Sequence, residues 1–205
     1  MTEIIDKSYF RELSSSTPEI LCRNGRCSHD TDTQQYALHI WGEQYLINGH
    51  KERIEHAAQN PAPHAYLDLF AMYYLLRGKD VAVRGKWVSE KDLPGGPTFF
   101  RGPHLIPTDH ISKSFANDLT AFKIHCSRLG GTPIAMADAA YQFSITADIP
   151  VAVLYWIGDE DFPAEAKILY DQSIAEHLSL DIVWALAVGI CARLGTAVSS
   201  STWPL

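Results

Sequence analysis

The chain has 205 residues, of which 46% are hydrophobic and 20% charged, an ordinary composition for a globular protein that can bury its own core. A net charge of −7 with neutral histidines argues against a general nucleic-acid binder, because phosphate binding requires a basic surface. The longest apolar stretch, residues 182–191, is too short to span a bilayer, and no signal-peptide pattern opens the sequence, so we expect a cytoplasmic protein with no membrane span.

The first half of the chain predicts a hairpin and a buried helix. Residues 1–20 are expected to form a short helix and a Ser/Thr-rich loop. "QYALHIW" and "QYLIN" alternate apolar and polar residues around Gly42-Glu43, which predicts a hairpin over 34–48. Pro61 and Pro63 mark the start of a helix over about 64–77 that ends at Gly78. Its apolar residues surround the helix, which favours a central, buried position.

The middle of the chain is predicted to be irregular over 79–109. "VAVRGKWVS" is a candidate strand, and "DLPGGPTFFRGPHLIPTDH" is rich in proline and glycine. A loop this long in a compact domain is often functional. Apolar residues three and four apart then predict one amphipathic helix over about 111–129, ended by Gly130-Gly131.

The last third predicts strands followed by helices. "AAYQFSI" is a candidate strand, "IPVAVLYWI" is predicted to be an interior strand, and "AKILYD" pairs with it as a hairpin. A short helix after Asp171 and a second helix from Ser179 to Leu194 follow. This order predicts an α+β fold with an antiparallel or mixed sheet and hairpins packed against several helices. We expect a single domain over 21–195, an N-terminal extension over 1–20 and a tail over 196–205.

An acidic hairpin tip is the first candidate site. "WIGDEDFPAEAKILYD" (156–171) gathers Asp159, Glu160, Asp161 and Glu165 after Gly158. Carboxylates suit hard cations or a general acid–base pair. The spacing lacks the pattern of a calcium loop, however, and a solvated turn in which Phe162 tucks inward is the alternative.

Cysteines supply the second candidate site. Cys22, Cys27 and His29 are soft ligands suited to zinc, an iron-sulfur cluster or haem. The two cysteines are separated by four residues and no second pair follows, so a loop with two incidental cysteines is the alternative. Cys126 and Cys191 are predicted to be core thiols.

The long middle loop is the third candidate site. Cations beside aromatic rings and exposed glycine backbone suit an anionic or planar ligand, and the histidines could bind a metal or haem iron. The alternative is a covering loop whose aromatic residues plug the core. The predicted ligand-contacting residues are Arg84, Lys86, Trp87, Phe100, Arg101, His104 and His110, together with Asp159 and Asp161 of the acidic tip.

Three sequence blocks carry a family resemblance. "GKWVSEKDLPGG" (85–96), "DLTAFKIHCSRLGG" (118–131) and the acidic hairpin together resemble the bacterial and archaeal domain of unknown function 3786 family, over roughly residues 20–194. The resemblance assigns no catalytic residue, because the activity of the family is uncharacterised. It implies an anaerobic host and an association with iron-sulfur or corrinoid-related modules, and so an accessory role in cofactor or one-carbon metabolism.

These features predict a non-catalytic cofactor-binding or accessory module in anaerobic metabolism. A tetrapyrrole (haem or corrinoid), a metal cofactor or a partner protein would lie in a groove between the 84–110 loop and the acidic hairpin, and the partner could be an iron-sulfur or corrinoid protein. Two alternatives stay open. One is a small enzyme that pairs the carboxylates of the acidic hairpin with a loop histidine, and the other is a subunit of a larger complex.

Overall fold

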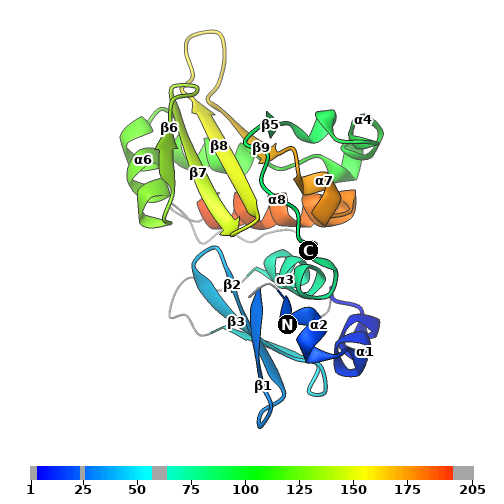
Figure 1. Cartoon of the computed structure of the whole chain (residues 1–205). Helices are drawn as coiled ribbons and strands as arrows, with labels where there is room; N and C mark the ends of the chain where they lie inside the picture. Colours follow the sequence, from blue (N-terminus) through cyan, green and yellow to red (C-terminus); the bar gives the residue numbers. More distant parts are fainter. Residues whose placement is uncertain (1–3, 24–25, 57–63, 196–205) are drawn as a thin grey trace.

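The computed structural model describes residues 4–23, 26–56 and 64–195, so the tail predicted over 196–205 lies outside the described residues. Two antiparallel sheets lie one above the other, with helix α3 (Ala65–Arg77) between them (Figure 1). This arrangement confirms the α+β class, with two sheets where the sequence predicted one. The main hydrophobic core runs through both sheets and the helices between them, and a small second cluster forms around Ala140, Ala152 and Leu154 of the second sheet. No helix in the described ranges is long and apolar enough to cross a bilayer.

The first sheet has the strand order β1-β2-β3-β4, and each strand is antiparallel to its neighbours. Two short helices from the N-terminal segment pack beside it (Figure 1). The elements of this half are α1 (Lys7–Ser15), α2 (Pro18–Leu21), β1 (Cys27–Asp30), β2 (Gln35–Ile40), β3 (Glu43–Asn48) and β4 (Arg53–His56).

The second sheet has the order β5-β9-β8-β7-β6, and β8 at its centre is buried along almost its whole length. The prediction of an interior strand is therefore confirmed. The strands are β5 (Trp87–Val88), β6 (Thr132–Ile134), β7 (Ala139–Thr146), β8 (Ile149–Trp156) and β9 (Glu165–Asp171). The helices of this half are η2 (Glu90–Asp92), α4 (Gly96–Phe99), η3 (Gly102–His104), α5 (Asp109–Phe115), α6 (Leu119–Arg128), α7 (Ile174–His177) and α8 (Leu180–Gly195).

The β2–β3 hairpin joins the two sheets. Its turn is Trp41-Gly42, one residue earlier than predicted, and both residues have a positive φ, of 49° and 77°. Such a two-residue turn matches the twist of a hairpin. The Trp41 backbone N–H donates to the Ile145 carbonyl at the end of β7 (2.7 Å), and its indole N–H donates to the Leu129 carbonyl (3.1 Å). The tip of the first sheet is thereby anchored in the second half of the molecule.

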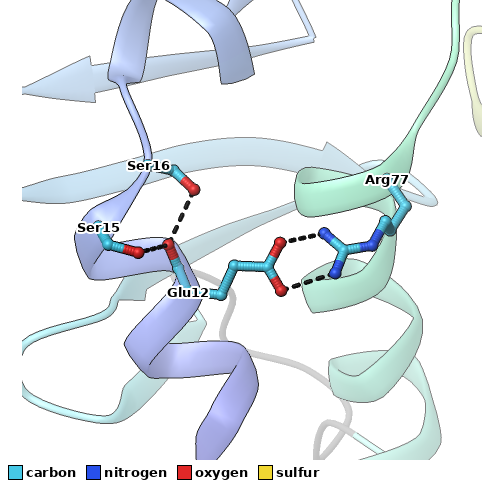
Figure 2. Close-up of polar contacts among 4 residues, drawn as sticks. All are labelled: Glu12, Ser15, Ser16 and Arg77. Atoms are coloured by element: carbon cyan, nitrogen blue, oxygen red, sulfur yellow. Dashed lines mark hydrogen bonds and ion pairs between the residues drawn. The ribbon is translucent and has the colours of Figure 1, made fainter.

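Helix α3 is central, as its apolar sequence predicts, and it ends at Gly78. It packs against α8, where a Cβ built on Gly189 would lie 2.6 Å from Leu67, so the two helices approach too closely for any larger residue. Helix α1 binds the other end of α3. The Glu12 carboxylate accepts both terminal N–H groups of Arg77, one at 2.6 Å, while the Ser15 and Ser16 hydroxyls donate to the Glu12 carbonyl (Figure 2).

The single helix predicted over 111–129 is wrong, because the chain forms two helices, α5 and α6, with a break at residues 116–118. Ala116 adopts φ 47° and ends α5, and Asp118 begins α6 by accepting a hydrogen bond from the Ala121 N–H (2.8 Å). The Tyr155 hydroxyl lies 2.6 Å from the Ala116 carbonyl and can donate to it. The helix is therefore broken here by a tertiary contact with β8, although the apolar periodicity of the sequence continues through the break.

Candidate functional site

A groove of about 710 Å³ lies between α5 and the turn that joins β8 to β9. One wall is the exposed face of α5, on which Asp109, Ser112, Lys113 and Ala116 recur three and four residues apart. The other wall is the end of the acidic hairpin and the first residues of β9. The lining residues are Thr108, Asp109, Ser112, Lys113, Ala116, Asn117, Phe162, Pro163, Ala164, Glu165 and Ala166.

The break between α5 and α6 holds the acidic turn in place. The Asn117 side-chain oxygen accepts the Gly158 N–H (2.8 Å), and its amide nitrogen donates to the Gly158 carbonyl (3.3 Å). This pairing fixes the first residue of the turn against the end of α5. The helix break, which the sequence periodicity did not predict, therefore holds in place the turn that forms one wall of the groove.

Asp159 organises the turn itself. Its carboxylate accepts the N–H groups of Asp161 (2.9 Å) and Phe162 (2.8 Å), an Asx-type turn. Phe162 does not tuck inward as expected, because 72% of it is exposed at the rim of the groove. Asp159 therefore shapes the turn, and neither it nor Asp161 lines the groove.

Asp171, at the end of β9, holds the start of the long loop. Three successive backbone N–H groups, those of Arg84 (3.0 Å), Gly85 (2.7 Å) and Lys86 (3.2 Å), donate to its carboxylate. The Arg84 guanidinium forms an ion pair with Glu176 of α7. The loop backbone thus does cradle an anion, and that anion is a carboxylate of this chain.

The remaining predicted residues of the long loop lie elsewhere. Phe100 is buried in the core, and the Arg101 Nε donates to the Pro97 carbonyl (2.5 Å). His104 stacks on Phe99 with ring centres 4.4 Å apart. None of the predicted loop residues, namely Arg84, Lys86, Trp87, Phe100, Arg101, His104 and His110, is in the groove lining. The structure brings the acidic hairpin beside Thr108 and Asp109 at the end of the long loop.

The predicted cysteine site spans the end of α2 and the start of β1. Cys22 follows α2 and Cys27 begins β1, and both thiols are free and partly buried. Burial, and then the neighbouring Cys22, raises the pKa of Cys27. His29 faces the same side of β1, where its ring centre lies 4.5 Å from that of Tyr36. Within the described ranges, no group of three or more His, Cys, Asp or Glu side chains has a geometry that could hold a metal ion.

The other two cysteines are fully buried, which confirms them as core thiols. Burial raises the pKa of Cys126 to about 12, so this thiol stays protonated at neutral pH. Burial raises the pKa of Cys191 as well.

A partly buried polar junction that sequence reasoning missed connects the two halves of the molecule. The Arg26 Nε lies 3.5 Å from the Asp148 carboxylate in the β7–β8 turn, and the Tyr74 hydroxyl of α3 donates to the same carboxylate (3.0 Å). His177 of α7, 2% exposed, lies close enough for Asp148 and Arg26 to affect its titration, while burial lowers its pKa. Because these residues are scattered along the chain, no local pattern could have placed them together.

Comparisons with known proteins add a family and no activity. No curated protein and no solved structure matches the chain. A family model described as Domain of unknown function (DUF3786) matches residues 17–193, which includes every element that lines the groove. This match confirms the resemblance carried by the three sequence blocks, and the chain belongs to the DUF3786 family.

Proposed function

We propose that this protein is a non-catalytic binding module whose ligand occupies the groove between α5 and the β8–β9 turn. One observation carries the proposal: a concave surface of about 710 Å³ has a largely exposed aromatic residue, Phe162, at its rim. Ligand pockets typically measure about 300–1,000 Å³ and combine apolar walls with a few polar groups. An exposed aromatic side chain beside such a hollow is suited to contact a ligand.

The chemistry of the lining favours a ligand with an apolar body and a positive group. Phe162, Pro163 and three alanines supply apolar walls. Lys113 donates to the Asp109 carboxylate (2.6 Å) and lowers the pKa of Asp109, so these two charges compensate one another. Glu165 adds a negative charge at the start of β9. The lining residues include no histidine or cysteine, so the groove does not offer the soft ligands that zinc, an iron-sulfur cluster or haem iron would require.

Benzamidine, a flat apolar cation, is the probe that tests the groove. We expect it to shift the NMR amide signals of Lys113, Asn117 and Phe162, and Phe162→Ser to weaken its binding about tenfold, because that change removes most of the apolar rim. Leu105→Ser is the matched control, since Leu105 is 62% exposed and lies outside the groove lining. Binding that spares these signals, or that is unchanged in Phe162→Ser, would contradict the proposal.

A planar cofactor is a second candidate, favoured by a row of half-buried rings. Phe99 stacks on His104 (4.4 Å between ring centres), His104 lies edge-on to Trp184 (5.7 Å), and Trp184 lies edge-on to Tyr66 (5.2 Å). Flat surfaces of this kind suit the faces of a tetrapyrrole, and His104 would be the iron ligand.

A haemin titration separates the two candidates. If the aromatic row holds a tetrapyrrole, the protein gives a saturable shift of the visible absorption band that His104→Leu abolishes and Phe162→Ser leaves intact. A shift that is equal in both variants would reject this site. The enzyme and complex-subunit alternatives stay predictions.

A further inference from the structure

The strand that borders the groove has an incomplete edge. Strand β5 pairs only with Tyr170 and Asp171, so residues 165–169 of β9 have a strand partner on the β8 side alone (Figure 1). No other backbone group in the described ranges bonds to this part of the edge. An open edge offers a row of unpaired N–H and C=O groups to another extended chain.

The open edge and the groove share residues. Glu165 and Ala166 belong to the unpaired part of β9 and also line the groove. Alternate residues of β9 face opposite sides, since Glu165 and Lys167 are exposed whereas Ala166 and Ile168 are buried. A strand added beside β9 would therefore direct every second side chain toward the α5 side, where the groove is, and the others toward the opposite face of the sheet, to which Lys167 points.

The charges around the groove indicate which kind of strand would bind there. Four carboxylates, those of Asp159, Glu160, Asp161 and Glu165, lie at or next to the end of the groove. None of them forms an ion pair with another described residue. Lys167 is the nearby positive residue of β9, and Lys113 is matched by Asp109. The excess negative charge favours lysine or arginine on the incoming strand, as does the overall charge of −7.

We propose that the groove captures an extended basic segment of a partner protein, which adds as a strand to the open edge of β9 and inserts alternate apolar side chains beside α5. This inference rests on the proposed function of the groove as a binding site. It goes further by naming the occupant as a polypeptide with alternating apolar and basic residues. Main-chain hydrogen bonds would supply affinity, and the groove and the acidic turn would supply specificity.

Short labelled peptides with alternating lysine and valine test the inference, with alternating glutamate and valine as the control. We expect the lysine peptide to bind about tenfold or more tightly than the glutamate peptide, with a difference that shrinks as salt is added. The double variant Glu160→Lys/Glu165→Lys should remove this preference. Asp32→Lys, an exposed change in the β1–β2 turn, should retain it.

Backbone methylation distinguishes strand addition from simple docking. In an added strand, alternate residues direct their N–H groups toward β9. Of two lysine peptides, one N-methylated at every valine and one at every lysine, exactly one should therefore lose binding by about tenfold or more. The amides of residues 165–169 should also gain protection from hydrogen exchange when the unmodified peptide binds.

The outcomes separate this inference from the function on which it rests. If benzamidine binds in the groove and no peptide binds, or both methylated peptides bind as well as the unmodified one, strand capture is rejected and the groove remains a binding site. If neither benzamidine nor any peptide binds, both proposals fail. A preference for the glutamate peptide would contradict the charge argument, and the proposal of a basic partner segment would then be rejected.

Discussion

Replacing Asp171 with alanine is expected to destabilise the protein by about 3–5 kcal/mol, because five donor groups would lose one shared, buried acceptor. The carboxylate accepts the N–H groups of Arg84, Gly85 and Lys86, and both the N–H (3.0 Å) and the hydroxyl (2.6 Å) of Ser173. Asp171 is only 2% exposed, so in the variant water cannot replace the carboxylate as the acceptor unless the loop rearranges. Urea denaturation measures the loss.

Asp161→Ala is the matched control for this prediction. Asp161 is an exposed aspartate whose carboxylate accepts no hydrogen bond within the described residues, so its replacement should change the unfolding free energy by less than about 0.5 kcal/mol. Asp171→Asn should lower the unfolding free energy nearly as much as Asp171→Ala. The amide nitrogen of asparagine is itself a donor, and it would face backbone N–H groups that need an acceptor. A loss below about 1 kcal/mol in Asp171→Ala would mean that the loop is held by other contacts.

The contribution of the Asp171 carboxylate to stability should depend on pH. Burial acts to raise the pKa of Asp171, but the hydrogen bonds from Ser173, Arg84 and Gly85 outweigh it and leave the pKa below its ordinary value. A lowered folded-state pKa means that the stabilisation is complete above the unfolded value of about 3.9 and is lost as pH falls through the folded value. The gap in stability between the natural protein and Asp171→Ala should therefore stay constant from neutral pH to about pH 5 and narrow as the pH falls below about 4.

The elements with strong local patterns could be predicted from the sequence. Strand β8 is an uninterrupted apolar run and α3 has proline before it and glycine after it, so both were found close to their observed bounds. The break between α5 and α6 was missed because Phe115, Leu119 and Phe122 keep helical spacing across it. What fixes the break is contact with β8 and the acidic turn, and local sequence does not contain that information.

The candidate site was only partly predictable for a related reason. A cluster of acids beside a proline marks an exposed turn, and the groove does border that turn. A cation or a backbone N–H in a loop can bind either an external ligand or a carboxylate of the same chain. The sequence of the loop does not tell these two cases apart. Here Glu176 pairs with the Arg84 side chain and Asp171 accepts the loop amides, two partners that only the folded chain brings near.

Replacing Glu43 with alanine is expected to cost about 3–5 kcal/mol, because it removes a carboxylate from a buried ion pair between the two halves of the molecule. Glu43, at the start of β3, lies 2.7 Å from the Arg193 guanidinium of α8, and their side chains are only 13% and 10% exposed. The guanidinium also lies 4.5 Å from the centre of the Trp41 ring. Burial lowers the pKa of Arg193 and Glu43 opposes that effect, so this carboxylate offsets part of the cost of a buried cation.

A double variant distinguishes a missing charge from lost packing. Glu43→Leu with Arg193→Met removes both charges while keeping apolar volume over Trp41, so it should lose much less stability than either single change. The exposed pair Arg53–Glu55 is the control, and Glu55→Ala should cost less than about 1 kcal/mol. If the double variant is as unstable as the sum of the two single changes, the pair contributes through shape and not through charge. In that case the contact of Trp41 with Ile145 and Leu129 would be what holds the two sheets together.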